Sequence, residues 1–375
     1  MELAEFRAGL DEWLDAHGAE LAPAEGDTTL ADDMTHLATV KRLTYDAGWI
    51  RYGWPERVEG LGGSPLLRAY LGEALTLRGF VEPGIYSMAE VLVPTMLDFA
   101  PPELAAEMVP RLLRGDETWC QGFSEPGTGS NLGSLACRAV RDGDGWRVTG
   151  QKVWTSLAQF AQRCVLLTRT GTVESTHRGI TALFVDMDSP GITVRPIRAM
   201  HGADEFCETF FDDVFVPVER TLGAEGQGWA VAMDLLPYER STALWHRAAF
   251  LQRRLGDLVA TAAPDSLDPD DVGAAVELLY AFRARSGATQ YRLDGGDKLG
   301  PETSVDKVLV ATAEQTIFDL ALDGVAAGIT TGDDTVSAEW RRDFLYSRAA
   351  TIYGGTAEIQ RNILARRVLD LGAEA

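Results

Sequence analysis

The chain has 375 residues, enough for two or three domains, and it is 46% hydrophobic, 9% aromatic and 24% charged. A chain of this composition can bury a large core, which excludes the disordered and collagen-like classes. Its 34 basic and 56 acidic residues leave a net charge of -22, and this negative field disfavours general binding to nucleic acid or to an anionic membrane surface.

Residues 1 to about 115 predict helices. Leu3, Phe6, Leu10 and Leu14 repeat at helical spacing, and apolar residues in 66–77 and 104–113 repeat in the same way. The Gly- and Pro-rich segment 53–65 predicts a loop between these helices.

The composition changes at about residue 117, where short β-type runs begin. These runs are separated by turn residues, with no helical stretch between them, and they occupy 146–156, 164–170, 179–187, 191–197 and 210–217. This spacing predicts an antiparallel sheet or barrel.

The helical period returns after Gly226. Residues 228–262 predict one long helix with a kink at Pro237, because proline removes a backbone donor there. Segments 270–292, 303–327 and 337–369 predict further helices. We therefore expect an α+β chain of three domains, with an N-terminal α-helical domain at 1–116, a middle antiparallel β-barrel domain at 117–222 and a C-terminal helical bundle at 223–375.

The cysteines and the first residues indicate a cytoplasmic protein. Cys120, Cys137, Cys164 and Cys207 stand far apart without a CxxC pair, and the first eighteen residues carry acids where a signal peptide would carry basic residues. We expect buried, reduced thiols. No apolar run is long enough for a transmembrane helix, and the five histidines lack metal-binding spacing, so neither a membrane span nor a metal site is expected.

The segment 119–130 is rich in hydroxyls and glycines. It does not form a dinucleotide fingerprint, because Pro126 precedes its glycines and β-type sequence follows where a helix would be required. Ser124, Thr128 and Ser130, together with closely approachable backbone, suit ribityl or phosphate oxygens. An ordinary hairpin loop explains the same residues.

Two later segments add to this pattern. In 151–156, Trp154 stands beside two hydroxyls, which suits either stacking on a cofactor ring or burial in the core. In 352–361, Gly354 and Gly355 free a loop to approach a ligand, and Thr356 is placed to cap the last helix.

Taken in this order, the three segments resemble the acyl-CoA dehydrogenase family of flavoproteins. The resemblance covers nearly the whole chain and includes motifs at 54–56, 62–63, 210–217 and 225–229. It implies an N-terminal helical domain, a middle β-barrel and a C-terminal four-helix bundle, with FAD between the β domain and the bundle.

The resemblance also implies roles for individual residues. The flavin would be lined by Gln121, Gly122, Phe123 and Ser124, with Trp154, Thr155 and Ser156 against the isoalloxazine ring. Thr356 and Glu358 would contact the cofactor near the last helix, and Ser130 would touch both the cofactor site and the CoA moiety. Further substrate contacts would come from Arg240 in the CoA channel, from Tyr238, and from Tyr353, for which simple packing is an equal alternative.

The implied reaction is α,β-dehydrogenation of an acyl-CoA thioester. A carboxylate removes the α-proton while hydride leaves the β-carbon for flavin N5, and the thioester oxygen accepts hydrogen bonds from a ribityl hydroxyl and one backbone N–H, here that of Gly354. Many family members carry the catalytic glutamate at the position of Gly354, but others carry it on the first bundle helix, where this chain has Glu239. We expect Glu239 to be the base; its alternative is a solvated helical acid. Because a glycine replaces the glutamate, we expect free volume beside the α-carbon and a branched or bulky acyl group.

Partners are implied in the same way. Electrons would leave to an electron-transfer flavoprotein, and the chain would form a homo-oligomer or a heterotetramer with an unlike family member in fatty-acid or steroid side-chain metabolism. The segment 283–288 lacks the Arg-x-x-Phe-Gly pattern that reaches a neighbouring FAD in many members. One alternative is therefore a non-catalytic subunit that completes the FAD site of a partner. Another is a flavin oxidase, a monooxygenase or a carrier-protein thioester dehydrogenase on the same fold.

Overall fold

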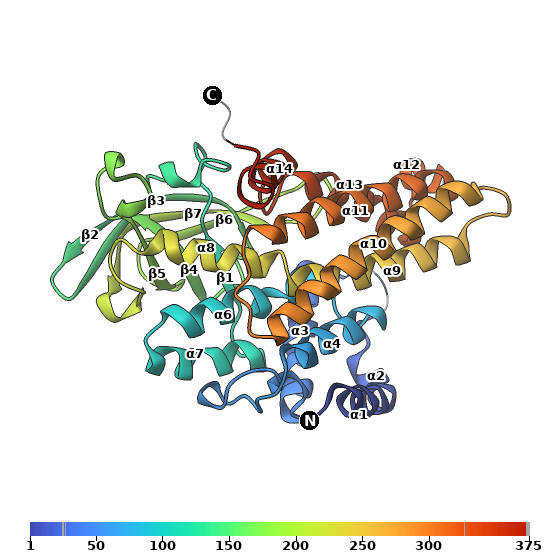
Figure 1. The fold of residues 1–375 in the computed structure, drawn as a ribbon, viewed down its shortest axis with the longest axis horizontal. Helices are drawn as coiled ribbons and strands as arrows, with labels where there is room; N and C mark the ends of the chain where they lie inside the picture. Colours follow the sequence, from blue (N-terminus) through green and yellow to red (C-terminus); the bar gives the residue numbers. More distant parts are fainter. Residues whose placement is uncertain (25, 27, 326, 373–375) are drawn as a thin grey trace.

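The computed structural model describes residues 1–24, 26, 28–325 and 327–372. Figure 1 shows N-terminal helices along one side, a twisted sheet at one end and a long bundle of C-terminal helices at the other. The first region contains α1 (Leu3–Ala16), α2 (Gly18–Leu21), α3 (Leu30–Asp46), α4 (Pro65–Leu77), α5 (Pro83–Tyr86), α6 (Met88–Phe99) and α7 (Pro102–Arg114).

Capping residues set several helix ends in this region. α3 begins with a capping box, in which the side chains of Thr29 and Asp32 bond each other's backbone N–H. α4 begins after Ser64, whose hydroxyl accepts a hydrogen bond from the N–H of Leu66, and α7 ends at Gly115, which has a φ of +81°. The helices predicted at 66–77 and 104–113 are confirmed.

The middle region forms one sheet. Its strands are β1 (Trp119–Gly122), β2 (Arg138–Asp142), β3 (Gly145–Ser156), β4 (Arg163–Arg169), β5 (Ile180–Asp186), β6 (Ile192–Ile197), β7 (Phe206–Pro217) and β8 (Thr221–Leu222). The strand order is β6-β7-β3-β2-β4-β5-β8, with β1 pairing beside β4.

The sheet departs from the predicted antiparallel barrel in two ways. It is open, because the end strands β6 and β8 do not pair with each other in the part of the chain that the structure describes. β8 has only two residues and pairs with β5, so it offers no ladder that could close a barrel. In addition, β1 pairs parallel to β4, because the chain enters the sheet from the N-terminal helices rather than through a hairpin.

The C-terminal region contains α8 (Gly228–Glu239), α9 (Thr242–Thr261), α10 (Pro269–Asp294), α11 (Ser304–Gly324), α12 (Ala327–Thr331), α13 (Thr335–Ser347) and α14 (Ala357–Ile363). The single helix predicted at 228–262 is wrong: it is divided into α8 and α9 by Ser241, which has φ -123° and ψ -100°. The break follows the last turn of α8, where the N–H groups of Arg240 and Ser241 bond back only three residues, to the carbonyls of Pro237 and Tyr238.

The helix predicted at 337–369 is likewise divided. A turn at 348–356 separates α13 from α14, and Gly354 and Gly355 in that turn have φ values of +62° and +89°. Thr356 caps α14 as expected, accepting a hydrogen bond from the N–H of Ile359 at 3.3 Å.

The hydrophobic core crosses the predicted domain boundaries. One cluster joins apolar residues of α1–α7 to Trp119 and Phe184 of the sheet and to Val231 and Leu235 of α8, whereas α9, α10, α11 and α13 enclose a second cluster. The division at 1–116, 117–222 and 223–375 stays a prediction. The four cysteines are buried and free, as expected. Within the described residues, no helix is both long and apolar enough to cross a bilayer.

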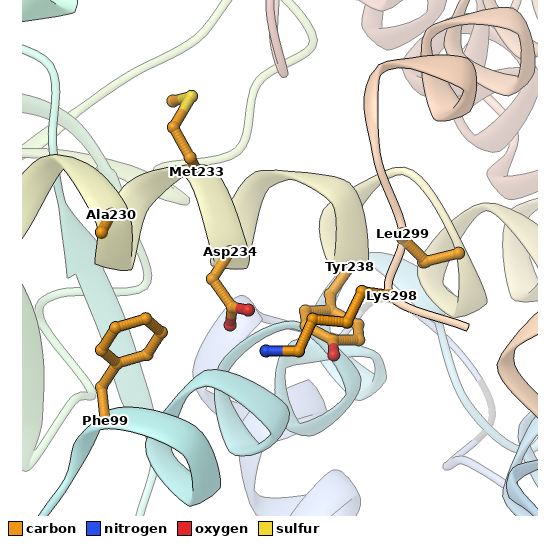
Figure 2. Close-up of a pocket in the computed structure, with 7 residues that line it drawn as sticks. All are labelled: Phe99, Ala230, Met233, Asp234, Tyr238, Lys298 and Leu299. Atoms are coloured by element: carbon orange, nitrogen blue, oxygen red, sulfur yellow. The ribbon is translucent and has the colours of Figure 1, made fainter. Parts of the chain in front are cut away.

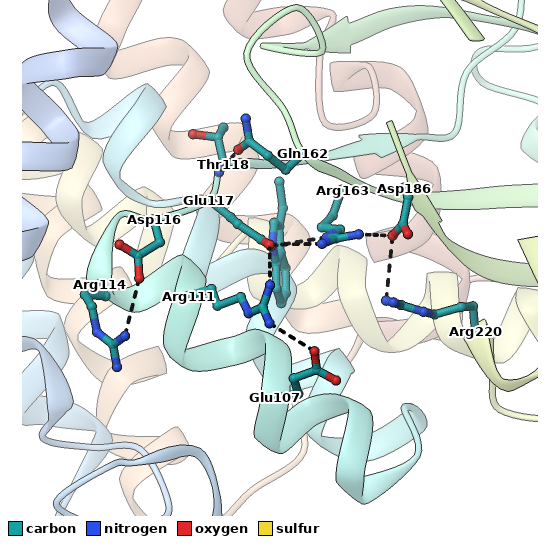
Figure 3. Close-up of polar contacts among 11 residues, drawn as sticks. Glu107, Arg111, Arg114, Asp116, Glu117, Thr118, Gln162, Arg163, Asp186 and Arg220 are labelled. Atoms are coloured by element: carbon teal, nitrogen blue, oxygen red, sulfur yellow. Dashed lines mark hydrogen bonds and ion pairs between the residues drawn. The ribbon is translucent and has the colours of Figure 1, made fainter. Parts of the chain in front are cut away.

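A chain of charged side chains ties α7 to the sheet, beginning with Arg111 of α7, whose Nη1 lies 3.4 Å from Oε1 of Glu117 (Figure 3). Glu117 accepts hydrogen bonds from Trp119 Nε1 and from Arg163 Nη2, both at 3.0 Å. Arg163 continues the chain to Asp186 on β5, which also faces Arg220 at 3.7 Å. These contacts fix the point where the chain passes from the N-terminal helices into β1.

Candidate active site

Glu239 lies in the last turn of α8, immediately before the break between α8 and α9. It is half-buried, and its Oε2 accepts a hydrogen bond of 3.2 Å from Nε2 of Gln121 on β1. The end of α8 therefore brings a carboxylate from the bundle against the sheet, so that two residues 118 positions apart meet.

Gly354 lies directly against this carboxylate. A Cβ built on Gly354 would stand 2.8 Å from Oε1 of Glu239 and 3.1 Å from Cε of Lys307. Glu239 thus occupies the space that a side chain at position 354 would need. The lack of a side chain at position 354 therefore leaves no empty space at that point, because Glu239 and Lys307 fill it. The branched or bulky acyl group stays a prediction.

The turn that carries Gly354 is held by the side chain of Arg240, which follows α8, and by that of Gln360 on α14. The Gly354 carbonyl accepts hydrogen bonds from Arg240 Nε at 3.2 Å and from Gln360 Nε2 at 3.0 Å. A Cβ on Gly355 would stand 2.3 Å from Gln360 Nε2, and the φ of Gly355 is +89°, so the close contact and the backbone conformation both favour glycine there. Arg240 is buried and binds backbone at this point, and its burial lowers the pKa of its guanidinium.

A buried ion pair positions the loop after β1. Lys152 on β3 is fully buried, and its Nζ lies 2.8 Å from Oε1 of Glu125 and 3.1 Å from the carbonyl of Phe123. Glu125 also accepts hydrogen bonds from the backbone N–H groups of Ala136 and Cys137. Sequence reasoning missed this pair, although a lysine on the inward side of β3, in line with buried Trp146 and Val148, was the available signal.

Trp154 and Thr155 lie where β3 leaves its regular pairing with β7. The ladder is irregular between Lys152 and Thr155, and Trp154 has a φ of +60°. The Trp154 side chain is 58% exposed, which excludes burial in the core as the reason for this residue. Thr155 is buried, and its hydroxyl has no hydrogen-bond partner within the chain.

These features fit a flavin cofactor. The exposed aromatic ring at Trp154 is suited to stacking, and the unpartnered buried atoms Oγ1 of Thr155, Oγ1 of Thr128 and Oε1 of Gln121 are available to a polar ligand. Gly127 and Gly129 leave open space around the loop. The described residues contain no group of three or more His, Cys, Asp and Glu arranged to hold a metal ion.

The remaining predicted contacts have simpler surroundings. Gly122 and Phe123 are buried, Ser124 and Ser156 are half-buried, and Ser130 and Glu358 are exposed. The Thr356 hydroxyl caps α14. The pKa of Glu358 is lowered by hydrogen bonds that its carboxylate accepts from the Glu358 backbone N–H and from the Thr356 side chain. Tyr353 packs near Tyr346, with ring centroids 6.0 Å apart, and faces Nζ of Lys307 at 4.3 Å.

A cavity of about 320 Å³ borders α8. Its walls come from α6, from α8 and from the loop before α11, and its lining residues are Phe99, Ala230, Met233, Asp234, Tyr238, Lys298 and Leu299. Figure 2 shows Asp234, Tyr238 and Lys298 gathered on the side of α8 that faces α6. Burial raises the pKa of Asp234, whose Oδ2 accepts a hydrogen bond from Thr95, and it raises the pKa of Tyr238 to about 12. Of these residues, sequence reasoning had identified only Tyr238.

The arginines of 283–288 are engaged within the chain. Arg283 pairs with Glu73 of α4 and lies over the Trp245 ring at 4.8 Å. Arg285 Nε lies 3.2 Å from Asp306, and its Nη2 donates to the carbonyl of Glu302 at 3.0 Å.

Family models match two parts of the chain. The model for the acyl-CoA dehydrogenase middle domain matches residues 120–214, and the model for the acyl-CoA dehydrogenase C-terminal domain matches residues 274–369.

Known proteins resemble the chain along its whole length. It is 37% identical to the acyl-CoA dehydrogenase IpdE1 of Mycobacterium tuberculosis, covering 100% of this chain and 99% of that protein. It superposes on the crystal structure of the ChsE4-ChsE5 complex of Mycobacterium tuberculosis with a TM-score of 0.79 and 25% identity, covering 100% of each chain. The steroid ACAD Tcur3481-Tcur3483 matches with a TM-score of 0.82 at 24% identity, covering 99% of this chain and 97% of that one.

Proposed function

The chain belongs to the acyl-CoA dehydrogenase family of flavoprotein oxidoreductases, and we propose that it oxidises an acyl-CoA thioester to its α,β-unsaturated product with Glu239 as the base. One observation carries this proposal: the Glu239 carboxylate occupies the space of a side chain at Gly354 and lies against that backbone. A glutamate at either of the two positions that the family resemblance offers would thus bring its side chain to the same region, which supports Glu239 as the base.

The residues around Trp154 and after β1 would hold FAD. We propose that Gln121, Phe123 and Thr155 line the flavin and that Trp154 stacks on it, with further contacts from Gly122, Ser124, Ser130, Ser156, Thr356 and Glu358. When bound there, FAD supplies the acceptor for the hydride that leaves the β-carbon.

Glu239 would remove the α-proton. Glu239 ends α8 and is half-buried against β1 and the turn at 348–356, which limits the access of water to its carboxylate. The hydrogen bond from Gln121 fixes the direction of the carboxylate. The Gly354 N–H would donate to the thioester oxygen as that oxygen gains enolate character, which stabilises the transition state for proton removal.

The cavity along α8 would hold part of a branched or bulky acyl group. Its volume of about 320 Å³ is at the lower end of the range for ligand pockets, and its lining includes Tyr238 but neither Glu239 nor Gly354. The acyl group would therefore extend past Tyr238 to reach it. Tyr353, Arg240 and Ser130 would form the remaining substrate contacts. We expect isobutyryl-CoA or a bulkier thioester to have a higher kcat/KM than butyryl-CoA; a clear preference for butyryl-CoA would contradict this part of the proposal.

We also propose that electrons pass to an electron-transfer flavoprotein and that the chain assembles with an unlike family member. Support for a mixed assembly comes from the solved ChsE4-ChsE5 complex. It also comes from Arg283 and Arg285, which are engaged by Glu73 and Asp306 and so are not free to reach a neighbouring FAD. The same observations favour, as a second candidate function, a subunit that completes the FAD site of its partner.

A visible spectrum followed by anaerobic titration with isobutyryl-CoA tests these proposals. We expect a flavin band that bleaches with the wild-type chain and does not bleach with Glu239→Gln, while Glu225→Gln, an exposed acid before α8, bleaches like wild type. Bleaching that survives Glu239→Gln would exclude Glu239 as the base. A folded but colourless chain that gains flavin only on co-expression with an unlike family member would favour the second candidate.

A further inference from the structure

Lys307 on α11 is a buried cation that has no role in the reaction proposed above. Its side chain runs under the turn at 348–356, where its Nζ donates to the carbonyl of Ala350 and lies 4.3 Å from the centroid of the Tyr353 ring. The whole residue is 3% exposed. A lysine buried to this extent loses its hydration, so its contacts must replace what water would provide.

The Lys307 side chain also reaches the place where the base lies. The point at which a Cβ on Gly354 would stand is 3.1 Å from Cε of Lys307 and 2.8 Å from Oε1 of Glu239, so these two atoms are within about 6 Å of each other. Lys307 and Glu239 therefore both lie beside the place that a Cβ on Gly354 would take.

The other cations in this region have partners of their own. Arg247 on α9 makes two hydrogen bonds to Glu314, at 2.7 and 2.9 Å, and Arg240, the residue after α8, donates to the Gly354 carbonyl. The charged groups that act on Lys307 are Glu314, Glu239, Arg240 and Arg247, and the ring facing it is that of Tyr353. Of these three cations, Arg240 binds the turn at the Gly354 carbonyl and Lys307 binds it at the Ala350 carbonyl, whereas Arg247 is paired with Glu314.

We propose that Lys307 is a positioning residue, whose ammonium holds the turn at 350–354 so that the Gly354 N–H and the Glu239 carboxylate keep the geometry needed for α-proton removal. This inference rests on the proposed function. Lys307 itself does not contact the reacting atoms; it acts through the turn and through its charge beside Glu239.

If Lys307 acts as its ammonium, turnover should depend on the pH at which Lys307 loses its proton. Burial lowers the pKa of Lys307 to about 8. The ammonium is present at neutral pH and is lost as the pH rises through 8, when the Ala350 carbonyl and the Tyr353 ring lose their cationic partner. Turnover should then fall on the alkaline side at a pH well below the ordinary titration range of lysine.

Three variants of the flavin-loaded enzyme test this, with isobutyryl-CoA as substrate. For Lys307→Met we expect kcat to fall on the order of 10²-fold with less change in KM, and the alkaline limb near pH 8 to disappear. For Lys307→Arg we expect most of kcat to return, also without that limb. Lys41→Met is the matched control: Lys41 is a second buried lysine with a pKa lowered to about 8, but it contacts Leu112 in α7, and its removal should leave the pH profile of kcat unchanged.

A second measurement does not depend on activity. Hydrogen–deuterium exchange of the backbone amides at 349–356 should be faster in Lys307→Met than in wild type, and unchanged in Lys41→Met. Wild-type kcat and an unaltered alkaline limb in a stably folded Lys307→Met, or unaltered exchange in the turn, would overturn the inference. Wild-type protein that binds flavin but oxidises no acyl-CoA would instead contradict the proposed function, and the exchange measurement would still decide the role of Lys307 in holding the turn.

Discussion

Gly354 is the residue on which the geometry of this site most depends. Its positive φ strains any other residue, and a Cβ there would meet both Glu239 and Lys307. We predict that Gly354→Ala lowers kcat by on the order of 10²-fold, because the carboxylate is displaced, and lowers the free energy of unfolding by about 1–2 kcal/mol. Steady-state kinetics and urea denaturation measure the two effects.

Gly256→Ala is the control for that prediction. Gly256 lies in the interior of α9 and is exposed, and a Cβ there would meet nothing within 4 Å. This change should raise the free energy of unfolding by up to about 1 kcal/mol and leave kcat unchanged. An active, stable Gly354→Ala would show that Glu239 has room to move.

The buried pair of Lys152 and Glu125 leads to a second prediction. Lys152→Met leaves the Glu125 carboxylate buried without its cation, so we expect the free energy of unfolding to fall by about 3–5 kcal/mol and FAD to be released more easily. Denaturation and flavin fluorescence on dilution measure these changes. Arg147→Met, which removes surface ion pairs with Asp142 and Asp213 from the same strand, should have a much smaller effect on both.

The sequence could indicate some of these residues and not others. Glu239 and Gly354 could be paired only through the family resemblance, because nothing local shows that the end of α8 meets a turn more than 100 residues later. Lys152, Glu125 and Lys307 could not be assigned at all, since a buried lysine and an exposed one have the same sequence signal until the partner is known. The alternation around Lys152 and the apolar face of α11 around Lys307 were the only clues.

At the scale of elements, helix and strand segments were predicted well and their breaks were not. The strands predicted at 146–156 and 210–217 are confirmed within β3 and β7, because β-branched and aromatic alternation is a local signal. Pro237 has no backbone N–H to donate, yet the break comes four residues later, at Ser241. Between them, the N–H groups of Arg240 and Ser241 bond back only three residues, which tightens the last turn of α8. Closure of the sheet depends on pairing of its end strands, which no local pattern specifies.

The junction between α7 and the sheet gives a prediction at this scale. Burial raises the pKa of the Glu117 carboxyl, but hydrogen bonds from Arg163 and Trp119 outweigh it, and the net pKa is below the ordinary value. Glu117 therefore stabilises the fold above the pKa of the unfolded carboxyl, about 4.5, and this contribution is lost as the pH falls through its folded value. Glu117→Gln should lower the free energy of unfolding by about 2–4 kcal/mol at pH 7, and by less at about pH 4.

Chemical denaturation at the two pH values measures this difference. The control is Glu107→Gln, which removes an exposed partner of Arg111 at the same junction and should cost less than about 0.5 kcal/mol at either pH. An equal loss at both pH values would mean that Glu117 acts by packing and not by charge.

At the scale of the whole molecule, the net charge of -22 acts on stability as well as on partner choice. Like charges repel one another more in the compact state than in the unfolded chain, and salt screens this repulsion. We predict that raising sodium chloride from about 10 mM to about 150 mM raises Tm by a few degrees. A calorimetric scan at each concentration measures it, and a fall in Tm would show that the ion pairs of the fold outweigh the net repulsion.

Trp154 has a practical consequence for following the protein in solution. It is the one exposed tryptophan in this chain of nine, all of which lie in described residues, while Trp54, Trp119, Trp146 and Trp340 are nearly inaccessible. Iodide should therefore quench the emission of this indole preferentially, and a flavin stacked on it should remove that component by shielding and by energy transfer. The chain thus carries an intrinsic fluorescent reporter of cofactor occupancy and needs no external dye. Trp154→Phe would remove that fluorescence component.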